Sequence, residues 1–349
     1  MTDLKSLSFE QLEEEIRKLG EPKYRAAQLF AWMHREKAAS FDEMTNLPKA
    51  LREKLKKEYT YTVIRIERVQ ESKTDGTRKY LFELPDGNLI ESVFMRYHHG
   101  NTVCVSTQVG CRMGCRFCAS TIDGLVRSLE PSEMLEQIYR IETDTGETVN
   151  HTVLMGSGEP FDNYDNVVAF IRLLTDERGK NLSVRNITVS TCGIPSGILK
   201  LADEDLPVTL ALSLHAPDDE TRKKLMPIAN RYPLAEVFSA CDAYFRKTGR
   251  RMTYEYSVVR GVNDTEEEAV KLGKLLHGKN AHVNLIPVNP IEERDFEKPL
   301  AASLAAFQKT LDKYGINATI RRELGADIDG ACGQLRRRVQ KENGIVHEQ

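Results

Sequence analysis

Cysteine is scarce in this chain, with seven residues among 349. So sparse and odd a set does not fit the disulfide framework of a small extracellular scaffold. Long apolar runs are also lacking, and none approaches the ~20 residues of a membrane-spanning helix. The opening segment, Met1 to Lys5, has no apolar core of the kind found in signal peptides. Reduced cysteines without an export signal predict a cytoplasmic protein with no membrane partner.

An excess of positive charge is missing as well. The chain carries 49 Lys and Arg against 52 Asp and Glu, a net charge of −3. No global basic field therefore indicates nucleic acid, although a local basic patch would be enough to bind it. Charged residues at 29% and hydrophobic residues at 40% are typical of a soluble globular protein. A length of 349 residues predicts one large domain with an appendage.

Residues 1–60 predict a small helical unit. Ser8 and Gln11 have the spacing of a capping box, and a second helix is expected to open at Pro22. A third helix, rich in Lys and Leu, follows between Pro48 and Tyr59. Because the charges nearly balance, two interpretations stay open: a solvated helical bundle, or an accessory domain that docks on RNA.

Residues 61–98 predict a small β-rich bridge. Two runs of alternating, β-branched and aromatic residues, 80–84 and 89–95, are separated by the turn sequence Pro85-Asp86-Gly87. This is the pattern of a β-hairpin. We therefore expect an antiparallel extension between the helical unit and the main domain.

Residues 99–349 alternate short apolar runs with amphipathic helices, which predicts parallel βα units. The expected strands are 103–107, 151–155, 186–190, 208–213, 252–258, 282–287 and 317–320. The expected helices include 131–142, 167–174, 235–246, 266–276 and 304–313. Unusual polar motifs follow nearly every strand, and in βα barrels the chemistry lies on the loops at the carboxyl ends of the strands. We therefore predict an α/β fold with a partial (β/α)6 barrel core whose mouth is a single site.

The loop after the first strand holds the most specific signal. Cys111, Cys115 and Cys118 have the spacing CxxxCxxC. Clusters of the [4Fe-4S] type are normally closed by four cysteines, so three thiols would leave one iron open for another ligand. Structural zinc usually takes paired CxxC or Cys/His sets that supply four ligands. Zinc and unliganded thiols nevertheless stay open as alternatives at this point.

Other polar residues at the strand ends are suited to a small ligand. Gly158 permits close backbone approach, and Glu159 can accept a hydrogen bond from an ammonium group. Short polar groups that suit a ribose, an adenine or a carboxylate follow on other strands. Taken singly, each of these residues is more often an ordinary turn or cap residue. The candidate cofactor-binding residues are Gly158, Glu159, Ser190, Ser213, Leu214, His215 and Asn289.

Two further cysteines are candidates for catalysis. Cys104 lies seven residues before the cysteine loop, at the start of the first expected strand, and can reach the same rim. Cys332 lies in a glycine-flanked stretch whose backbone freedom would suit a nucleophile that travels. A buried inert thiol is the default for a lone cysteine, and Cys192 and Cys241 are expected to be of that kind.

The spacing of the cysteine loop, with Phe117 before its last cysteine, resembles the radical S-adenosylmethionine (SAM) enzymes. The motifs Cys104-Val-Ser-Thr-Gln-Val-Gly-Cys111, Gly158-Glu159-Pro160, Ser213-Leu214-His215 and 325–335 are similar to the dual-specificity 23S rRNA/tRNA adenine-C2 methyltransferases of that superfamily. The match covers essentially the whole chain. One departure is Ser157, where many members carry methionine.

This resemblance implies a [4Fe-4S] cluster on Cys111, Cys115 and Cys118 and two SAM molecules per turnover. Cys332 takes a methyl group from the first SAM. The second SAM, bound to the open iron, yields a 5′-deoxyadenosyl radical, and the activated methyl group on Cys332 adds to adenine C2. Attack of Cys104 on the Cys332 sulfur then releases the RNA and leaves a disulfide. Glu91 matches the family's proposed base, although a solvated strand carboxylate is the alternative.

The implied partners are 23S rRNA before full ribosome assembly, tRNA, and an electron donor such as flavodoxin or ferredoxin. Between residues 313 and 341 seven basic side chains stand against three acidic ones, a local charge of +4. They are Lys313, Arg321, Arg322, Arg336, Arg337, Arg338 and Lys341 against Glu323, Asp327 and Asp329. For Arg336 to Arg338 we expect contacts with phosphates, a solvated helix end being the alternative.

Three rival functions remain at this level. A methyltransferase specific for C8 of the same adenine would share the chemistry and differ in regiochemistry. A radical SAM activase or mutase would not depend on Cys104 or Cys332. A non-catalytic RNA-binding protein would carry zinc without iron.

Overall fold

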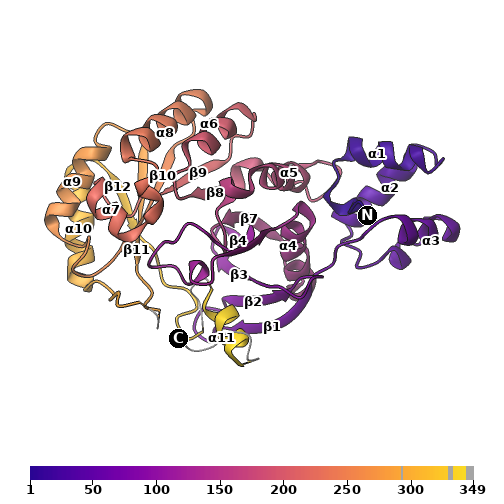
Figure 1. Cartoon of the computed structure of the whole chain (residues 1–349), viewed down its shortest axis with the longest axis horizontal. Coiled ribbons are helices and arrows are strands. Elements are labelled where there is room, and N and C mark those ends of the chain that lie inside the picture. Colours follow the sequence, from indigo (N-terminus) through magenta and orange to yellow (C-terminus); the bar gives the residue numbers. More distant parts are fainter. Residues whose placement is uncertain (292–293, 329–332, 343–349) are drawn as a thin grey trace.

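The computed structural model describes residues 1–291, 294–328 and 333–342. Its centre is a ten-stranded sheet whose strands follow one another in a linear order (Figure 1). Each of the seven strands expected from the sequence overlaps one of its parallel strands. These are β4 (Gly100–Cys104), β7 (Val149–Leu154), β8 (Ile187–Thr191), β9 (Thr209–Ser213), β10 (Met252–Val258), β11 (Ala281–Pro287) and β12 (Asn317–Ile320).

Helices join the parallel strands, because parallel neighbours cannot be connected by a tight turn. Together with the linear strand order, these six βα steps make the partial (β/α)6 barrel that the sequence predicts, which is thus confirmed. The crossover helices are α4 (Pro131–Thr145), α5 (Tyr164–Thr175), α6 (Pro195–Asp203), α8 (Leu234–Thr248), α9 (Glu266–Leu276) and α10 (Ala301–Lys313). Two further helices, α7 (Asp219–Leu225) and α11 (Gln334–Glu342), lie outside this pattern.

Helix α4 shows how local sequence sets these boundaries. Pro131 occupies its first turn, where the fixed φ of proline suits the helix and no N–H is needed. Glu130 and Glu133 form a reciprocal cap, each side chain accepting from the other residue's backbone. The helix ends at Gly146, whose φ of 69° lies in the left-handed region that favours glycine.

The amino-terminal helices are α1 (Phe9–Lys18), α2 (Tyr24–His34) and α3 (Lys49–Glu58), and the predicted capping box of Ser8 and Gln11 is present. They lie beside α4 and α5 at one end of the molecule (Figure 1). Lys5 Nζ lies 2.7 Å from Glu136 Oε1, with both side chains fully buried. Removing one partner of such a pair would leave an uncompensated buried charge. The helical unit is therefore fastened to the barrel by specific contacts.

The β-rich bridge consists of β1 (Arg65–Glu71), β2 (Arg78–Glu83) and β3 (Leu89–Tyr97), paired antiparallel in that order. The hairpin expected around Pro85-Asp86-Gly87 is confirmed as β2–β3. Strand β3 also pairs antiparallel with β4. The bridge thus extends the barrel's own sheet and covers the edge of β4.

One expected position is wrong: Cys104 ends its strand rather than beginning it, because β4 starts at Gly100 directly after a turn from β3. The carboxyl end of β4 is nevertheless the barrel mouth, so Cys104 reaches the rim by its own place in the strand. Among the helices of the described residues, none has the length and apolar character to cross a membrane.

Candidate active site

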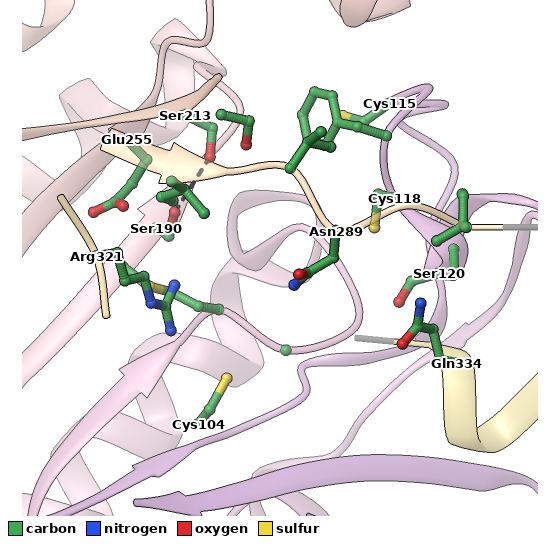
Figure 2. A pocket seen from close by; sticks show the side chains of 18 of the residues that line it. Cys104, Cys115, Cys118, Ser120, Ser190, Ser213, Glu255, Asn289, Arg321 and Gln334 are labelled. Carbon is green, nitrogen blue, oxygen red and sulfur yellow. Dashed lines mark hydrogen bonds between the residues drawn. The ribbon is translucent and has the colours of Figure 1, made fainter. Parts of the chain in front are cut away.

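A cavity of about 510 Å³ opens at the carboxyl ends of the parallel strands. Residues that follow or end β4, β7, β8, β9 and β11 contribute to its wall, as the distribution of polar motifs predicts. Figure 2 shows cysteine, serine and amide side chains around this one space. The predicted site residues that line it are Cys104, Cys111, Cys115, Cys118, Gly158, Glu159, Ser190, Ser213, His215 and Asn289.

The cysteine loop is held by a two-stranded ribbon, β5 (Gln108–Gly110) and β6 (Leu125–Ser128). Gly110 has a φ of 75°, and a Cβ there would lie 2.0 Å from the carbonyl oxygen of Gly124, so only glycine fits. Thr121 Oγ1 donates to the carbonyl oxygens of Cys115 and Cys118 at 3.0 and 2.9 Å. The loop's shape therefore follows from its own sequence.

The three thiols of this loop influence one another. Burial raises the pKa of Cys111 to about 12 and that of Cys115 well above its ordinary value, and nearby Cys118 raises both further. Three thiolates here would need a compensating cation. Among the described residues no three His, Cys, Asp or Glu side chains are grouped closely enough to hold one metal ion. An iron–sulfur cluster requires no such grouping, since each cysteine binds a separate iron.

Glu159 is buried beside the cysteine loop. Its two oxygens accept from the backbone N–H groups of Phe161 and Cys192 at 3.0 and 2.8 Å, and burial raises its pKa. Gly158 before it has a φ of 110°, and a Cβ would lie 2.7 Å from Thr107 Oγ1. The strand-end turn is thus packed so closely that the carboxylate has one fixed position.

The serines and the histidine come from adjacent strands. Ser190 and Ser213, at the ends of β8 and β9, have their hydroxyls 3.4 Å apart (Figure 2). His215 Nδ1 accepts from the backbone N–H of Ser257 at 2.8 Å, which places the proton of the neutral ring on Nε2. Burial lowers the pKa of His215 to about 3, so the ring stays neutral above that range. Phe117 packs edge-on against it at 4.7 Å between ring centroids.

Leu214 does not line the cavity. Its side chain is fully buried in the core, and its carbonyl oxygen accepts from Arg222 Nε at 3.1 Å. The prediction that it binds a cofactor rests on its place between Ser213 and His215, whose side chains point differently from its own. Its structural part is to hold the turn that carries His215.

Glu255 is a cavity residue that the sequence analysis did not predict. Glu255 on β10 is buried, and its Oε1 accepts from Asn284 at 2.9 Å. Among the described residues, no donor reaches its buried Oε2. A carboxylate inside the apolar run of residues 252–258 was the available signal, because unpaired buried carboxylates are costly. Figure 2 shows it near Ser190 and Ser213.

The cysteines outside the loop differ in burial and in whether they line the cavity. Cys104 is buried and faces the cavity with the loop cysteines (Figure 2). Cys241 is a fully buried core thiol, as expected. Cys192 is also buried but contributes to the cavity wall. Cys332 lies outside the described residues, although Gly333 and Gln334 after it are described.

Glu91 is absent from the described cavity wall and has other partners. Its carboxylate lies 3.0 Å from Lys79 Nζ and accepts from the backbone N–H groups of Gly333 and Arg336, both at 2.6 Å. These contacts connect β3 to the start of α11. Three donors occupy this carboxylate, and the part of Glu91 as a base stays a prediction.

The expected phosphate contacts of Arg336 and Arg337 do not fit the structure. Both side chains are buried, and both form ion pairs with Asp123, at 3.3 and 2.6 Å. Arg338 is exposed, and its contact with RNA phosphates stays a prediction. A run of arginines does not reveal a distant partner, which is why the sequence suggested a solvated or RNA-bound helix end.

Known proteins share both parts of this architecture. A family model described as the radical SAM superfamily matches residues 105–273, and one described as the ribosomal RNA large subunit methyltransferase N-terminal domain matches residues 2–60. The chain is 59% identical to a probable dual-specificity RNA methyltransferase RlmN of Lachnospira eligens, over 98% of each chain. It is 56% identical to a protein of the same name from Lachnoclostridium phytofermentans, over 96% of this chain and 94% of that one.

The chain belongs to the RlmN family. A crystal structure of a radical SAM methyltransferase from Sphaerobacter thermophilus has a TM-score of 0.92 to this RlmN-family fold, at 43% identity over 96% of this chain and 99% of that one. The chain is therefore an RNA methyltransferase of the radical SAM superfamily, as its motifs indicated. Membership implies a [4Fe-4S] cluster and SAM as cofactors, and the three thiols of the cysteine loop fit the first of these.

Proposed function

We propose that this enzyme methylates C2 of an adenine in the peptidyl-transferase region of 23S rRNA, and of an adenine in the anticodon loop of certain tRNAs. The observation that carries the proposal is that Cys104 faces the same cavity as Cys111, Cys115 and Cys118. A cysteine outside the cluster set is what a covalent methyl transfer needs, and polar attack on SAM by adenine C2 is implausible because that carbon is electron-poor.

Different residues around the cavity would bind different parts of the cofactors. Cys111, Cys115 and Cys118 would hold the cluster. Glu159 and Asn289 suit the polar methionine end of SAM, and Ser190, Ser213 and Glu255 suit the ribose hydroxyls. When bound, the cluster and SAM supply a methyl group and an adenosyl radical. His215 and Phe117 would form a wall that restricts access of water.

The two catalytic thiols would act in sequence, with two SAM molecules consumed per turnover. The Cys332 thiolate accepts a methyl group, since a thiolate is a competent nucleophile. The methyl group on Cys332 would lose a hydrogen atom to the adenosyl radical, its carbon would bond to adenine C2, and the C2 proton and one electron would then leave. The Cys104 thiolate attacks the Cys332 sulfur, the bond between that sulfur and the methylene carbon breaks, and the released carbon takes up a proton. That attack releases the methylated RNA and leaves a Cys104–Cys332 disulfide, which must be reduced before the next cycle.

The parts of the chain would have separate tasks. We assign residues 1–60 to docking on RNA, 61–98 to a β-rich bridge and 99–349 to the catalytic core. The target adenine has to leave its stack before it can enter the cavity. A small electron donor such as flavodoxin or ferredoxin would reduce the cluster, which fits a cytoplasmic enzyme acting on 23S rRNA before full ribosome assembly.

The experiment combines anaerobic protein, SAM, a reductant and a 23S rRNA fragment, followed by digestion and mass spectrometry of the nucleosides. The proposal predicts 2-methyladenosine, and none from Cys332→Ala. Formation of 8-methyladenosine would assign the enzyme to the C8-specific alternative. Methylation by Cys332→Ala would contradict the proposed use of that thiol.

A further inference from the structure

The described residues on both sides of 329–332 are fastened to parts of the chain far away in sequence. After this segment, Gly333 and Arg336 contact Glu91; before it, Gly325 and Asp327 contact the turn between β1 and β2. None of these contacts is made with a parallel strand of the barrel. These contacts therefore do not serve to hold the parallel strands together, which points to another role.

The downstream attachment begins at the amino terminus of α11. Glu91 accepts two backbone N–H groups there, Gly333 and Arg336, each at 2.6 Å. A carboxylate at this position satisfies donors that have no partner within the helix and favours the helix dipole. Lys79, itself fully buried, compensates the charge at 3.0 Å. Gln334 Nε2 adds a bond to the carbonyl oxygen of Pro290, beside Asn289.

The same helix end is pressed against the cysteine loop. Asp123, five residues after Cys118, pairs with Arg336 and Arg337 at 3.3 and 2.6 Å. Gly333 has a φ of 83°, and a Cβ on it would lie 2.7 Å from the backbone nitrogen of Ser120. Figure 2 shows Gln334 and Ser120 close to Cys118. The helix that follows Cys332 therefore rests directly on the loop that carries the cluster cysteines.

The upstream attachment lies on the β1–β2 turn. Asp327 accepts from Ser72 Oγ at 2.6 Å, from the backbone of Lys73 at 2.8 Å and from Thr74 Oγ1 at 3.0 Å. Asp75 on this turn accepts from the backbone N–H of Gly325 at 2.9 Å. Together with Glu91 on β3, the bridge thus supplies partners on both sides of residues 329–332.

We propose that Glu91 and Asp123 are positioning residues that fix the start of α11 against the cysteine loop, and that the β1–β3 bridge anchors the described residues on both sides of 329–332. The inference rests on the proposed role of Cys332. Transfer between two separately bound groups requires reacting atoms about 3–3.5 Å apart, and an error of 1 Å can cost about 100-fold in rate. Contacts that fix the described residues on both sides of 329–332 would serve that requirement.

The test measures 5′-deoxyadenosine formed per adenine methylated, together with iron content and SAM affinity. In Asp123→Asn and Glu91→Gln, we expect this ratio to rise about tenfold or more, while iron content and SAM affinity stay within about twofold, because radical formation does not need the helix in place. Asp123→Glu should bring the ratio back toward the parent value. Asp86→Asn is the matched control, since Asp86 pairs with Arg127 at 2.6 Å.

A general loss of folding would lower cleavage of SAM and methylation of RNA together and leave the ratio unchanged. An unchanged ratio in both variants overturns the inference. If Asp123→Asn loses iron, Arg337→Gln is used instead, because it breaks the same ion pair from the α11 side. An unchanged ratio in Arg337→Gln would also overturn the inference. Cys332→Ala in the same assay tests the proposed function separately, because RNA methylation by that variant would contradict the function whatever the ratio.

Discussion

The two sides of the active-site cavity are built in opposite ways. On the cluster side, three cysteines lie within eight residues, and a local ribbon and a glycine hold their loop. On the carboxyl-terminal side, the start of α11 is held by Glu91 and Asp123, more than 200 residues earlier in the chain. Side chains that local spacing brings together can be predicted from the sequence. Side chains that are brought together by contacts between distant parts of the chain become evident only from the fold.

The largest expected effect comes from breaking the cluster side. Cys115→Ala removes one of three ligands, so we expect loss of the iron and of all SAM cleavage, with RNA methylation abolished. Iron analysis and 5′-deoxyadenosine formation measure this directly. Cys241→Ala is the control, because that thiol is fully buried in the hydrophobic core and does not line the cavity; this variant should keep its iron.

A second change tests the opposite side without touching the cluster. Cys104→Ala should retain iron and SAM cleavage but lower RNA methylation by ~100-fold or more, since no thiolate remains to release the RNA. A protein–RNA adduct should then accumulate and be visible by denaturing electrophoresis. Cys192→Ala, also in the cavity wall, should release its RNA normally. If Cys104→Ala turns over like the parent, the release step is wrong.

Glu255 lies between the two sides and allows a finer test. If its Oε2 accepts a ribose hydroxyl, Glu255→Ala should weaken binding of S-adenosylhomocysteine by about tenfold, the value of one hydrogen bond to a charged group. The same variant should bind the 2′,3′-dideoxy analogue as the parent does. Calorimetry with the four combinations forms a double-mutant cycle. Equal discrimination against the analogue by both proteins would remove Glu255 from the cofactor site.

The smallest effect concerns stability, away from either side. Burial lowers the pKa of His34 to about 3, below its ordinary value of 6.5, so the unfolded state binds the proton more readily. Stability is therefore full above about pH 6.5 and falls as the pH drops below it, by about 2 kcal/mol at pH 5 for this group. His34→Gln, which keeps a partner for Tyr139, should lose this part of the pH dependence in denaturant titrations. The control is His277→Gln, at an exposed histidine, which should keep the pH dependence of the parent protein.

Much of the fold could be predicted because strands and helices here obey local patterns. Helix α9 occupies the predicted residues, and the parallel strands overlap their predicted runs. Helix α6, which begins with Pro195-Ser-Gly, was not among the predicted helices, and helix α11 was anticipated only as a possible helix end at Arg336 to Arg338. Both helices have only nine residues, and helices this short depend on packing against the rest of the chain for their stability.

The candidate site was predicted to the extent that its residues follow strand ends. Leu214 does not line the cavity, because its side chain is buried in the core, so its part in cofactor binding stays a prediction. Arg336 and Arg337 failed because charge in a sequence says nothing about a partner such as Asp123. The contacts of Glu91 with the start of α11 could not be predicted, because they join residues more than 200 positions apart in the chain.

The most direct measurement of the central claim is the electron paramagnetic resonance spectrum of the reduced, anaerobically prepared protein with and without SAM. The account predicts about four irons per chain and a spectrum that changes when SAM is added, because one iron has no cysteine ligand. Iron-free protein, or a cluster whose spectrum is indifferent to SAM, would contradict it.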